Sequence, residues 1–378
     1  MTYPTISHFI EDITGFFIPL PIQTFGLFIV LAFLAAHYFI KKEFLRLEAI
    51  GILKETPNKD YNTLNIVEYV FNGLISFLFG YKIIYILKNY KLFAESPQEY
   101  LLSTNGNIIM GIIFLIISII QIYNTNKRKD QSQSVPVLPS QLSWNFIFIA
   151  GLSGIVGAKL FAVFEDVNHL ITDPLGALFS FSGLTFYGGL IFGTISVIIY
   201  AKKHKINIPD IADIFAPSLI LGYGIGRLGC HFSGDGDWGI ISNTSIKPNF
   251  IPDWFWGYNF PHNVIESGVK MEGCVGRYCY ELPYLVYPTS LYEACFAITA
   301  FLLLYYMRKK IQIPGFLFCI YLVFNGIERF FIETIRITEK YSILGYNLTQ
   351  AQFIAILITI IGIILMIYLK RKTNYESI

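Results

Sequence analysis

The sequence predicts an all-α membrane protein whose helices cross the bilayer about nine times. Only 14% of the 378 residues are charged and 54% are hydrophobic, whereas a soluble domain carries about 25% charged residues. Several apolar runs reach about 18 to 20 residues, the length that a helix needs to cross the hydrocarbon core. Basic residues follow every second run. These observations indicate a polytopic helical protein, and a net charge of +2 without an aromatic-rich basic cluster gives no sign of nucleic-acid binding.

The expected spans occupy nine segments: roughly 22–40, 66–88, 107–124, 144–164, 184–201, 211–230, 289–307, 314–334 and 348–369. Positive residues collect in cytoplasmic loops. Here they follow the odd-numbered spans, in the groups Lys41–Arg46, Lys127–Lys129, Lys202–Lys205, Arg308–Lys310 and Lys370–Lys372. The N-terminus is therefore expected outside and the C-terminus in the cytoplasm. Residues 1–40 hold no lysine or arginine, so we expect no cleavable signal peptide.

Three parts follow from this order of spans. Residues 1–40 form an N-terminal segment with the first span, residues 41–143 form a two-span insertion, and residues 144–378 form the membrane core. The core includes an outer head, residues 231–288, which is rich in Gly, Pro and aromatic residues. Such a head is either an interfacial cap or a segment that controls access to a site below it. Its two cysteines, Cys274 and Cys279, could pair on an oxidising face or remain reduced.

A faint internal repeat relates the insertion to residues 144–201. The insertion is interpreted as a decayed copy of this part of the core, and chance similarity between apolar segments is the alternative. At an offset of 77 positions, Gly80, Lys82, Pro97, Ser103, Gly106 and Gly111 correspond to Gly157, Lys159, Pro174, Ser180, Gly183 and Gly188.

Residues 216–239 form the stretch around which the chain is organised. An apolar helix carries Arg227 near its end and then breaks into a turn rich in glycine and aspartate. An ionisable group in an apolar span indicates a functional site. His231 lies four residues after Arg227, on a neighbouring face of the helix. Small residues that recur every four positions predict a smooth face against which another helix packs; they are Ser218, Gly222, Gly226 and Cys230.

The same stretch contains a glycine pattern, Gly224-x-Gly226-x-x-Gly229, that also occurs in dinucleotide-binding proteins. In those proteins the pattern follows a strand and opens a helix. Here it closes an apolar helix, so a nucleotide site is not expected.

A second group of polar residues lies in the eighth span. Asn325, Arg329, Glu333 and Arg336 share one helical face, at spacings of four, four and three. By topology this face and Arg227 lie at the outer leaflet, where two arginines form a cradle for a phosphate group. The alternative is a purely structural Arg329–Glu333 ion pair that fixes helix packing.

Two further segments lie at the outer ends of spans. Residues 287–293 begin the seventh span with Pro and Ser, which is ordinary chemistry for a helix start. The functional interpretation places Tyr292 or Glu293 beside the arginines. Residues 182–189 begin the fifth span and include Tyr187 and Gly188. The glycines of this segment could simply permit close helix packing.

With these four elements together, the chain resembles the bacterial prolipoprotein diacylglyceryl transferases. The resemblance extends over residues 18–40 and about 144–370, in unchanged order, and leaves the second and third spans outside. The matching pieces are residues 183–193, 213–229, 287–294, 328–336 and 348–352, with a looser fit over 21–33.

The resemblance implies a reaction at the outer face of the bacterial cytoplasmic membrane. The diacylglyceryl group of phosphatidylglycerol is transferred to the thiol of a cysteine in a prolipoprotein signal peptide, and glycerol phosphate leaves. Arg227 and Arg329 match the essential arginines of the family. No metal or cofactor is implied, and the partners are the two substrates and the lipid bilayer. The residues expected to bind substrate are Gly188, Gly226, Gly229, Asp235, Tyr292, Glu293 and Arg336.

The sequence departs from the family at positions that concern the catalytic base. Tyr187 stands where the family has a histidine, and Cys230 stands where it has an asparagine. A thiol with a pKa near 8.5 needs only modest help to ionise, and Tyr187 is a poor base at neutral pH. His231 is the expected replacement, with Asp235 and Glu333 next. The expected catalytic set is thus Arg227, Arg329, His231, Tyr187 and Glu333.

Two other functions fit the composition. Paired arginines and glycine-broken helices also suit a carrier for an anionic solute. Carriers, however, place their sites near the bilayer midplane, whereas Arg227 and Arg329 lie near the outer ends of their spans. An inactive membrane scaffold is favoured only by the missing family histidine.

Overall fold

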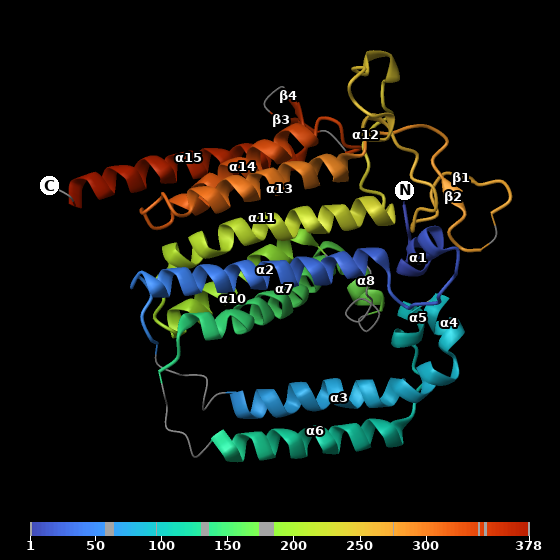
Figure 1. The fold of residues 1–378 in the computed structure, drawn as a ribbon, viewed down its shortest axis with the longest axis horizontal. Helices are drawn as coiled ribbons and strands as arrows, with labels where there is room; N and C mark the ends of the chain where they lie inside the picture. Colours follow the sequence, from blue (N-terminus) through green and yellow to red (C-terminus); the bar gives the residue numbers. More distant parts are fainter. Residues whose placement is uncertain are drawn as a thin grey trace.

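The structure is a computed structural model that describes residues 2–56, 64–95, 97–129, 136–173, 185–274, 276–338, 341–343 and 346–376. Within these ranges the chain is mostly helical, and each of its two small sheets has two antiparallel strands. The long helices lie roughly along a common axis, and the short helices and loops gather at one end (Figure 1).

The first half of the chain holds α1 (Ile6–Thr14), α2 (Thr24–Ala49), α3 (Leu64–Lys88), α4 (Tyr90–Glu95), α5 (Pro97–Leu102), α6 (Ile108–Lys129), η1 (Pro139–Leu142), α7 (Ser143–Glu165) and α8 (Val167–Thr172). The second half holds α10 (Phe186–Lys203), α11 (Ile208–Ser233), η2 (Thr244–Ile246), α12 (Asp253–Trp256), β1 (Val269–Lys270), β2 (Tyr280–Glu281), α13 (Thr289–Met307), α14 (Phe316–Ile332), β3 (Tyr341–Ile343), β4 (Tyr346–Leu348) and α15 (Gln350–Glu376).

The all-α membrane class is confirmed. Each of the nine expected ranges overlaps a long helix: α2, α3, α6, α7, α10, α11, α13, α14 or α15. In the described part of the chain, five helical segments are long and apolar enough to cross a membrane, namely 24–49, 139–165, 208–233, 289–307 and 350–373. The N-terminus lies at the end that carries the head, and the C-terminus lies at the opposite end (Figure 1).

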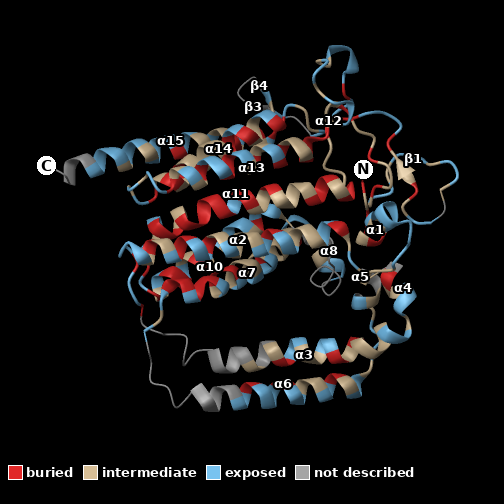
Figure 2. Cartoon of the chain, viewed as in Figure 1, coloured by how far each residue is buried: buried red, intermediate tan, exposed pale blue. Residues whose placement is uncertain are grey.

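Helix α11 lies at the centre of the bundle and packs against α2, α13 and α14. Figure 2 shows that buried residues concentrate on α11 and its neighbours. Pro209 lies in the first turn of the helix, where the missing proline N–H is not needed. Gly234 ends it in the left-handed conformation, with φ of 63°, and its N–H donates to Cys230 O over 3.0 Å.

The small-residue face predicted for α11 is wrong at its two central glycines. A Cβ added at Gly222 or Gly226 would meet nothing within 4 Å. Close packing occurs instead at Gly224, where a Cβ would lie 2.9 Å from the Cβ of Ala297 on α13. The four-residue period identified a face but not the neighbour that covers it, and α13 packs on another side of α11.

Two helical hairpins, α3 with α6 and α7 with α10, each contain an equivalent backbone hydrogen bond between their two halves. The N–H of Asn107, which precedes α6, donates to Tyr81 O over 2.7 Å. The N–H of Thr185, which precedes α10, donates to Ala158 O over 3.2 Å. The carbonyl partners lie 77 positions apart in the sequence and the N–H partners 78.

A tight glycine contact is also common to both hairpins. A Cβ at Gly80 would lie 2.5 Å from Met110 O, and one at Gly157 would lie 2.5 Å from Gly188 O. Each glycine therefore lets two helix backbones approach closely. Three positions of the sequence repeat lie outside the described residues: Pro174, Ser180 and Gly183.

The head covers the end of α11 with extended segments. Val264 N–H donates to Ser233 O over 3.1 Å, and Tyr258 N–H donates to Val286 O over 2.9 Å. Phe260, Leu282 and Val286 form a small buried core, with Trp238 and Tyr258 packed against it. The head is thus a folded cap on the bundle.

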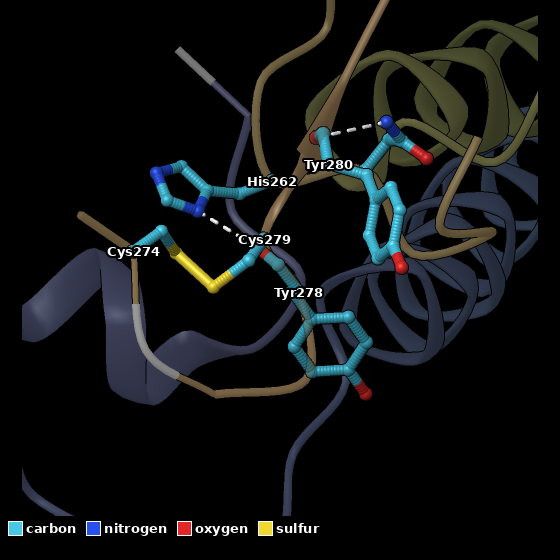
Figure 3. The surroundings of a disulfide bond; sticks show 6 residues. His262, Cys274, Tyr278, Cys279 and Tyr280 are labelled. Carbon is cyan, nitrogen blue, oxygen red and sulfur yellow. Dashed lines mark hydrogen bonds between the residues drawn. A yellow bond between two sulfur atoms is a disulfide. The ribbon is translucent and has the colours of Figure 1, made fainter. Parts of the chain in front are cut away.

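Cys274 and Cys279 form a disulfide, which answers the question that the sequence left open. It lies on the loop between β1 and β2, next to His262 (Figure 3). A hydrogen bond of 2.8 Å joins His262 Nδ1 to Tyr278 O. The ring of Tyr278 also contacts His8 of α1, with ring centroids 6.0 Å apart. The disulfide loop and α1 therefore pack together at the head.

Candidate active site

Four segments bring charged side chains together at the end of the bundle that carries the head. They are the last turns of α11, the head turn after it, the start of α13 and the end of α14 with the turn that follows. Ion pairs connect six side chains, which we call the arginine cluster: Arg227, Asp237, Glu293, Arg329, Glu333 and Arg336.

Glu293 is the centre of the arginine cluster. Its Oε2 lies 2.9 Å from Arg227 Nε, and its Oε1 lies 3.4 Å from Nη1 of both Arg329 and Arg336. One carboxylate therefore contacts three guanidinium groups from two other helical segments. Because a buried carboxylate needs paired charges, Glu293 holds these three arginines at one place.

Asp237 and Glu333 complete the ion pairs. Asp237 accepts hydrogen bonds from Arg227 Nη1 and Arg336 Nη2, and Glu333 Oε2 lies 3.1 Å from Arg329 Nη2. The structural Arg329–Glu333 pair considered from the sequence is therefore present. This pair is part of the cluster rather than an isolated ion pair that only fixes helix packing, because Arg329 also contacts Glu293.

Burial divides the cluster into a sealed side and an open side. The side chains of Glu293 and Glu333 are 0% and 1% exposed, whereas those of Arg227, Arg329 and Arg336 are 18%, 30% and 15% exposed. Asp237 is 27% exposed. An approaching molecule therefore meets the three guanidinium groups and Asp237 before it meets the buried carboxylates of Glu293 and Glu333. Arginine presents planar, two-pronged donors that fit phosphate oxygens, so this side of the cluster can hold a phosphate group.

The sequence patterns did not identify three residues near Arg227, namely Tyr223, Glu328 and Asp237. The ring of Tyr223 lies under the Arg227 guanidinium, 5.1 Å from centroid to Cζ, and Tyr223 OH donates to Glu328 Oε1 over 3.4 Å. Tyr223 precedes Arg227 by four residues, which was an available signal. The third residue, Asp237, reaches Arg227 only because the chain reverses at Gly234, and no local pattern distinguishes it from Asp235.

Other predicted residues lie around the cluster without joining its ion pairs. His231 is buried, and its ring packs against Phe232, Tyr258 and Phe260 at centroid distances of 5.5–5.7 Å. Tyr292 OH donates to Phe255 O over 2.5 Å and ties α13 to the head. The role of His231 as a base stays a prediction.

Asp235 lies beside the cluster. Its side chain accepts a hydrogen bond of 3.2 Å from Asp237 N–H. Its carboxylate also lies within 4.8 Å of Asp237 and Cys230 ligand atoms, the group of potential metal ligands found among the described residues. Asp237 already pairs with two arginines, so a cation there would face Arg227 and Arg336. The expectation that no metal takes part stays a prediction.

The predicted residues of the fifth span lie elsewhere. Tyr187 is 39% exposed at the start of α10, with its ring beside Phe186.

Two of the three glycines predicted to bind substrate lie at helix contacts. A Cβ at Gly188 would lie 2.3 Å from Gly157 O, and one at Gly229 would lie 2.7 Å from the Cβ of Phe28 on α2. The geometry gives both glycines a role in helix packing, whereas Gly226 borders open space.

Comparisons with known proteins identify the family of the chain. The family model described as prolipoprotein diacylglyceryl transferase matches residues 108–368. This range includes α6, which the sequence resemblance had left outside.

Among similar proteins is the phosphatidylglycerol–prolipoprotein diacylglyceryl transferase of Oceanobacillus iheyensis, 32% identical over 270 residues, 70% of this chain and 85% of that protein. The proteins of the same name from Clostridium botulinum (strain Loch Maree) and Staphylococcus saprophyticus are 34% and 31% identical, over 61% and 62% of this chain and 82% and 75% of theirs. With the arginine cluster at its head end and a family match over more than half of its length, this chain belongs to the prolipoprotein diacylglyceryl transferase family.

Proposed function

We propose that the protein transfers the diacylglyceryl group of phosphatidylglycerol to the cysteine thiol of a prolipoprotein signal peptide. The thiol sulfur attacks the glyceryl carbon, the bond from that carbon to the phosphate oxygen breaks, and a thioether forms. Glycerol phosphate leaves with the bonding electron pair, and the thiol proton goes to a base. The observation that carries the proposal is the convergence of three partly exposed arginines on buried Glu293 in a chain of this family.

The arginines would act on the leaving group. As the carbon–oxygen bond breaks, negative charge grows on the phosphate, and preorganised guanidinium groups stabilise that charge. Interactions that strengthen in the transition state raise the turnover rate rather than only the affinity. Arg227 and Arg329 are assigned this role, and Arg336 supports them through Glu293.

Asp235 is our candidate for the thiol base. Four side chains were considered as bases: His231 is enclosed by aromatic rings, Tyr187 lies at the start of α10, and Glu333 is 1% exposed and paired with Arg329. Asp235 approaches the cluster through its hydrogen bond with Asp237 N–H. Nearby arginines lower the pKa of a substrate thiol, so a weak base suffices. Asp235→Asn should then lower the turnover rate more than His231→Ala or Tyr187→Phe.

The membrane orientation is part of the proposal. Nine spans, with the N-terminus and the head outside, place the phosphate chemistry at the outer face of the bacterial cytoplasmic membrane. The head carries the Cys274–Cys279 disulfide, a bond typical of oxidising compartments. The arginine cluster lies at the head end of α11 rather than halfway along it. This position favours a transferase over the alternative, a carrier with a midplane site.

We further infer that α3 and α6 are a duplicated copy of the α7–α10 hairpin. The shared hydrogen bond and glycine contact support this interpretation. None of the six residues of the arginine cluster lies on α3 or α6, so the duplicated hairpin is not assigned a catalytic role.

The test uses purified protein in phosphatidylglycerol vesicles with a cysteine-containing signal peptide. Mass spectrometry should find the peptide increased by one diacylglyceryl group, and glycerol phosphate should appear in equal amount. A cysteine-to-serine peptide is the control and should stay unmodified. Unchanged peptide mass in the presence of folded protein would refute the proposal.

A further inference from the structure

The resting arginine cluster is already neutralised. Its three guanidinium groups face three carboxylates: Glu293, Glu333 and Asp237. A phosphodiester brings one more negative charge into the same group of donors. The phosphate and the carboxylates would then contact the same guanidinium groups, and like charges that lie so close together repel strongly where water is scarce. Binding of a phosphate therefore favours the departure of one resident carboxylate.

The three carboxylates differ in how easily they can leave. Glu293 and Glu333 are sealed inside the bundle on α13 and at the end of α14. Asp237 belongs to the head turn, and its side chain is 27% exposed. An unpaired carboxylate has a much higher free energy inside the protein than in water. Asp237 is therefore the carboxylate that can leave its arginines and be solvated.

The turn lets the carboxylate leave while its backbone stays in place. Thr289 Oγ1 donates to Asp237 O over 2.9 Å, and Gly239 N–H donates to Tyr287 O over 2.9 Å. These bonds fix the chain after the Asp237 side chain, and the Asp237 N–H, which donates to Asp235 Oδ1 over 3.2 Å, fixes the chain before it. The preceding Gly236 has φ of 99°, a conformation that suits glycine. Rotation of the Asp237 side chain alone would therefore release Arg227 and Arg336.

We propose that Asp237 occupies the phosphate position in the resting protein and that the phosphate group of the lipid substrate displaces it. The inference rests on the proposed function and adds a residue that sets affinity at the same site. Asp237 accepts from two different arginines, as a phosphate oxygen would. Its return to Arg227 and Arg336 would also help to expel glycerol phosphate after the transfer.

Asp237→Asn tests the proposal, because it removes the competing charge and keeps the size of the side chain. The KM for phosphatidylglycerol should fall by about fivefold or more, and glycerol phosphate should inhibit at correspondingly lower concentration. Asp237→Glu keeps the charge and should keep a KM near the wild-type value. Asp253→Asn is the matched control: Asp253 is a head carboxylate on α12 that is 93% exposed and pairs with Lys247 at 2.5 Å rather than with an arginine of the cluster. It should leave both constants unchanged.

A merely structural role gives a different result. If Asp237 only positions Arg227 and Arg336, Asp237→Asn should lower kcat and leave the KM for phosphatidylglycerol unchanged or raise it, which would overturn the proposal. Binding of glycerol phosphate to the purified variants, measured by calorimetry, provides a second readout without turnover; equal affinity in wild type and Asp237→Asn would also overturn it. Failure of the proposed function is distinct, because the wild-type protein would then form no thioether at all.

Discussion

Glu293→Gln should destabilise the protein although it only replaces one carboxylate oxygen with an NH2 group. The substitution removes the charge that three arginines share at 2.9–3.4 Å and leaves them facing two carboxylates. Removing one partner of a buried ion pair costs about 3–5 kcal/mol. Because the arginines keep some contact with solvent, we expect the lower end, about 3 kcal/mol. The transfer rate should fall at least about tenfold, since a misplacement of catalytic groups by about 1 Å is costly.

The measurement is a denaturant titration in micelles, together with the transfer rate per folded molecule. Glu266→Gln is the matched control, because Glu266 pairs with Arg277 at 3.1 Å on the head surface, with side chains 39% and 53% exposed. Exposed pairs contribute only about 0–1 kcal/mol. Equal destabilisation by the two substitutions would show that Glu293 does not hold the cluster together.

Three further predictions concern other parts of the chain. Accessible tags at the N-terminus and in the head, with a protected tag after Lys205, would agree with the proposed topology; a protected head would put the cluster on the wrong leaflet. Excision of about residues 50–135 with a short polar linker should leave measurable transfer, and complete loss in stably inserted protein would mean that the hairpin shapes the site. Burial lowers the pKa of His8, so the folded protein binds fewer protons there than the unfolded chain. The packing of α1 should therefore weaken as the pH falls below about 6.5. Proteolysis of the N-terminal segment at pH 5 and 7.5 checks this, and pH dependence that persists in His8→Gln would contradict it.

The sequence revealed the parts of the site that stand out against an apolar background. Arg227 and Arg329 are charges inside hydrophobic spans, which must be paired or functional. Helical spacing then related Glu333 and Arg336 to Arg329, and the structure places all of them in one cluster. Glu293 was found as a candidate only because its helix was expected to begin at the membrane depth of the two arginines.

The missing parts depend on contacts that no local pattern contains. Asp237 joins the cluster through a chain reversal, and the sequence favoured its neighbour Asp235. Small residues at every fourth position predicted a packing face, but α13 packs at Gly224, off that pattern. Periodicity gives the face of a helix and not the identity of the element that covers it, so such contacts need the tertiary structure.

The most direct test of the arginine cluster compares transfer by Arg329→Ala with Glu333→Gln against transfer by Glu333→Gln alone. Glu333 is buried and pairs with Arg329 at 3.1 Å, so the second substitution avoids leaving it charged and unpaired. Thioether formation is measured per molecule of folded, inserted protein. If Arg329 holds the phosphate, the double variant should be folded and at least about a hundredfold slower than Glu333→Gln, the loss typical for one such donor. Equal rates in the two variants would contradict the account and reduce Arg329 to a structural partner of Glu333.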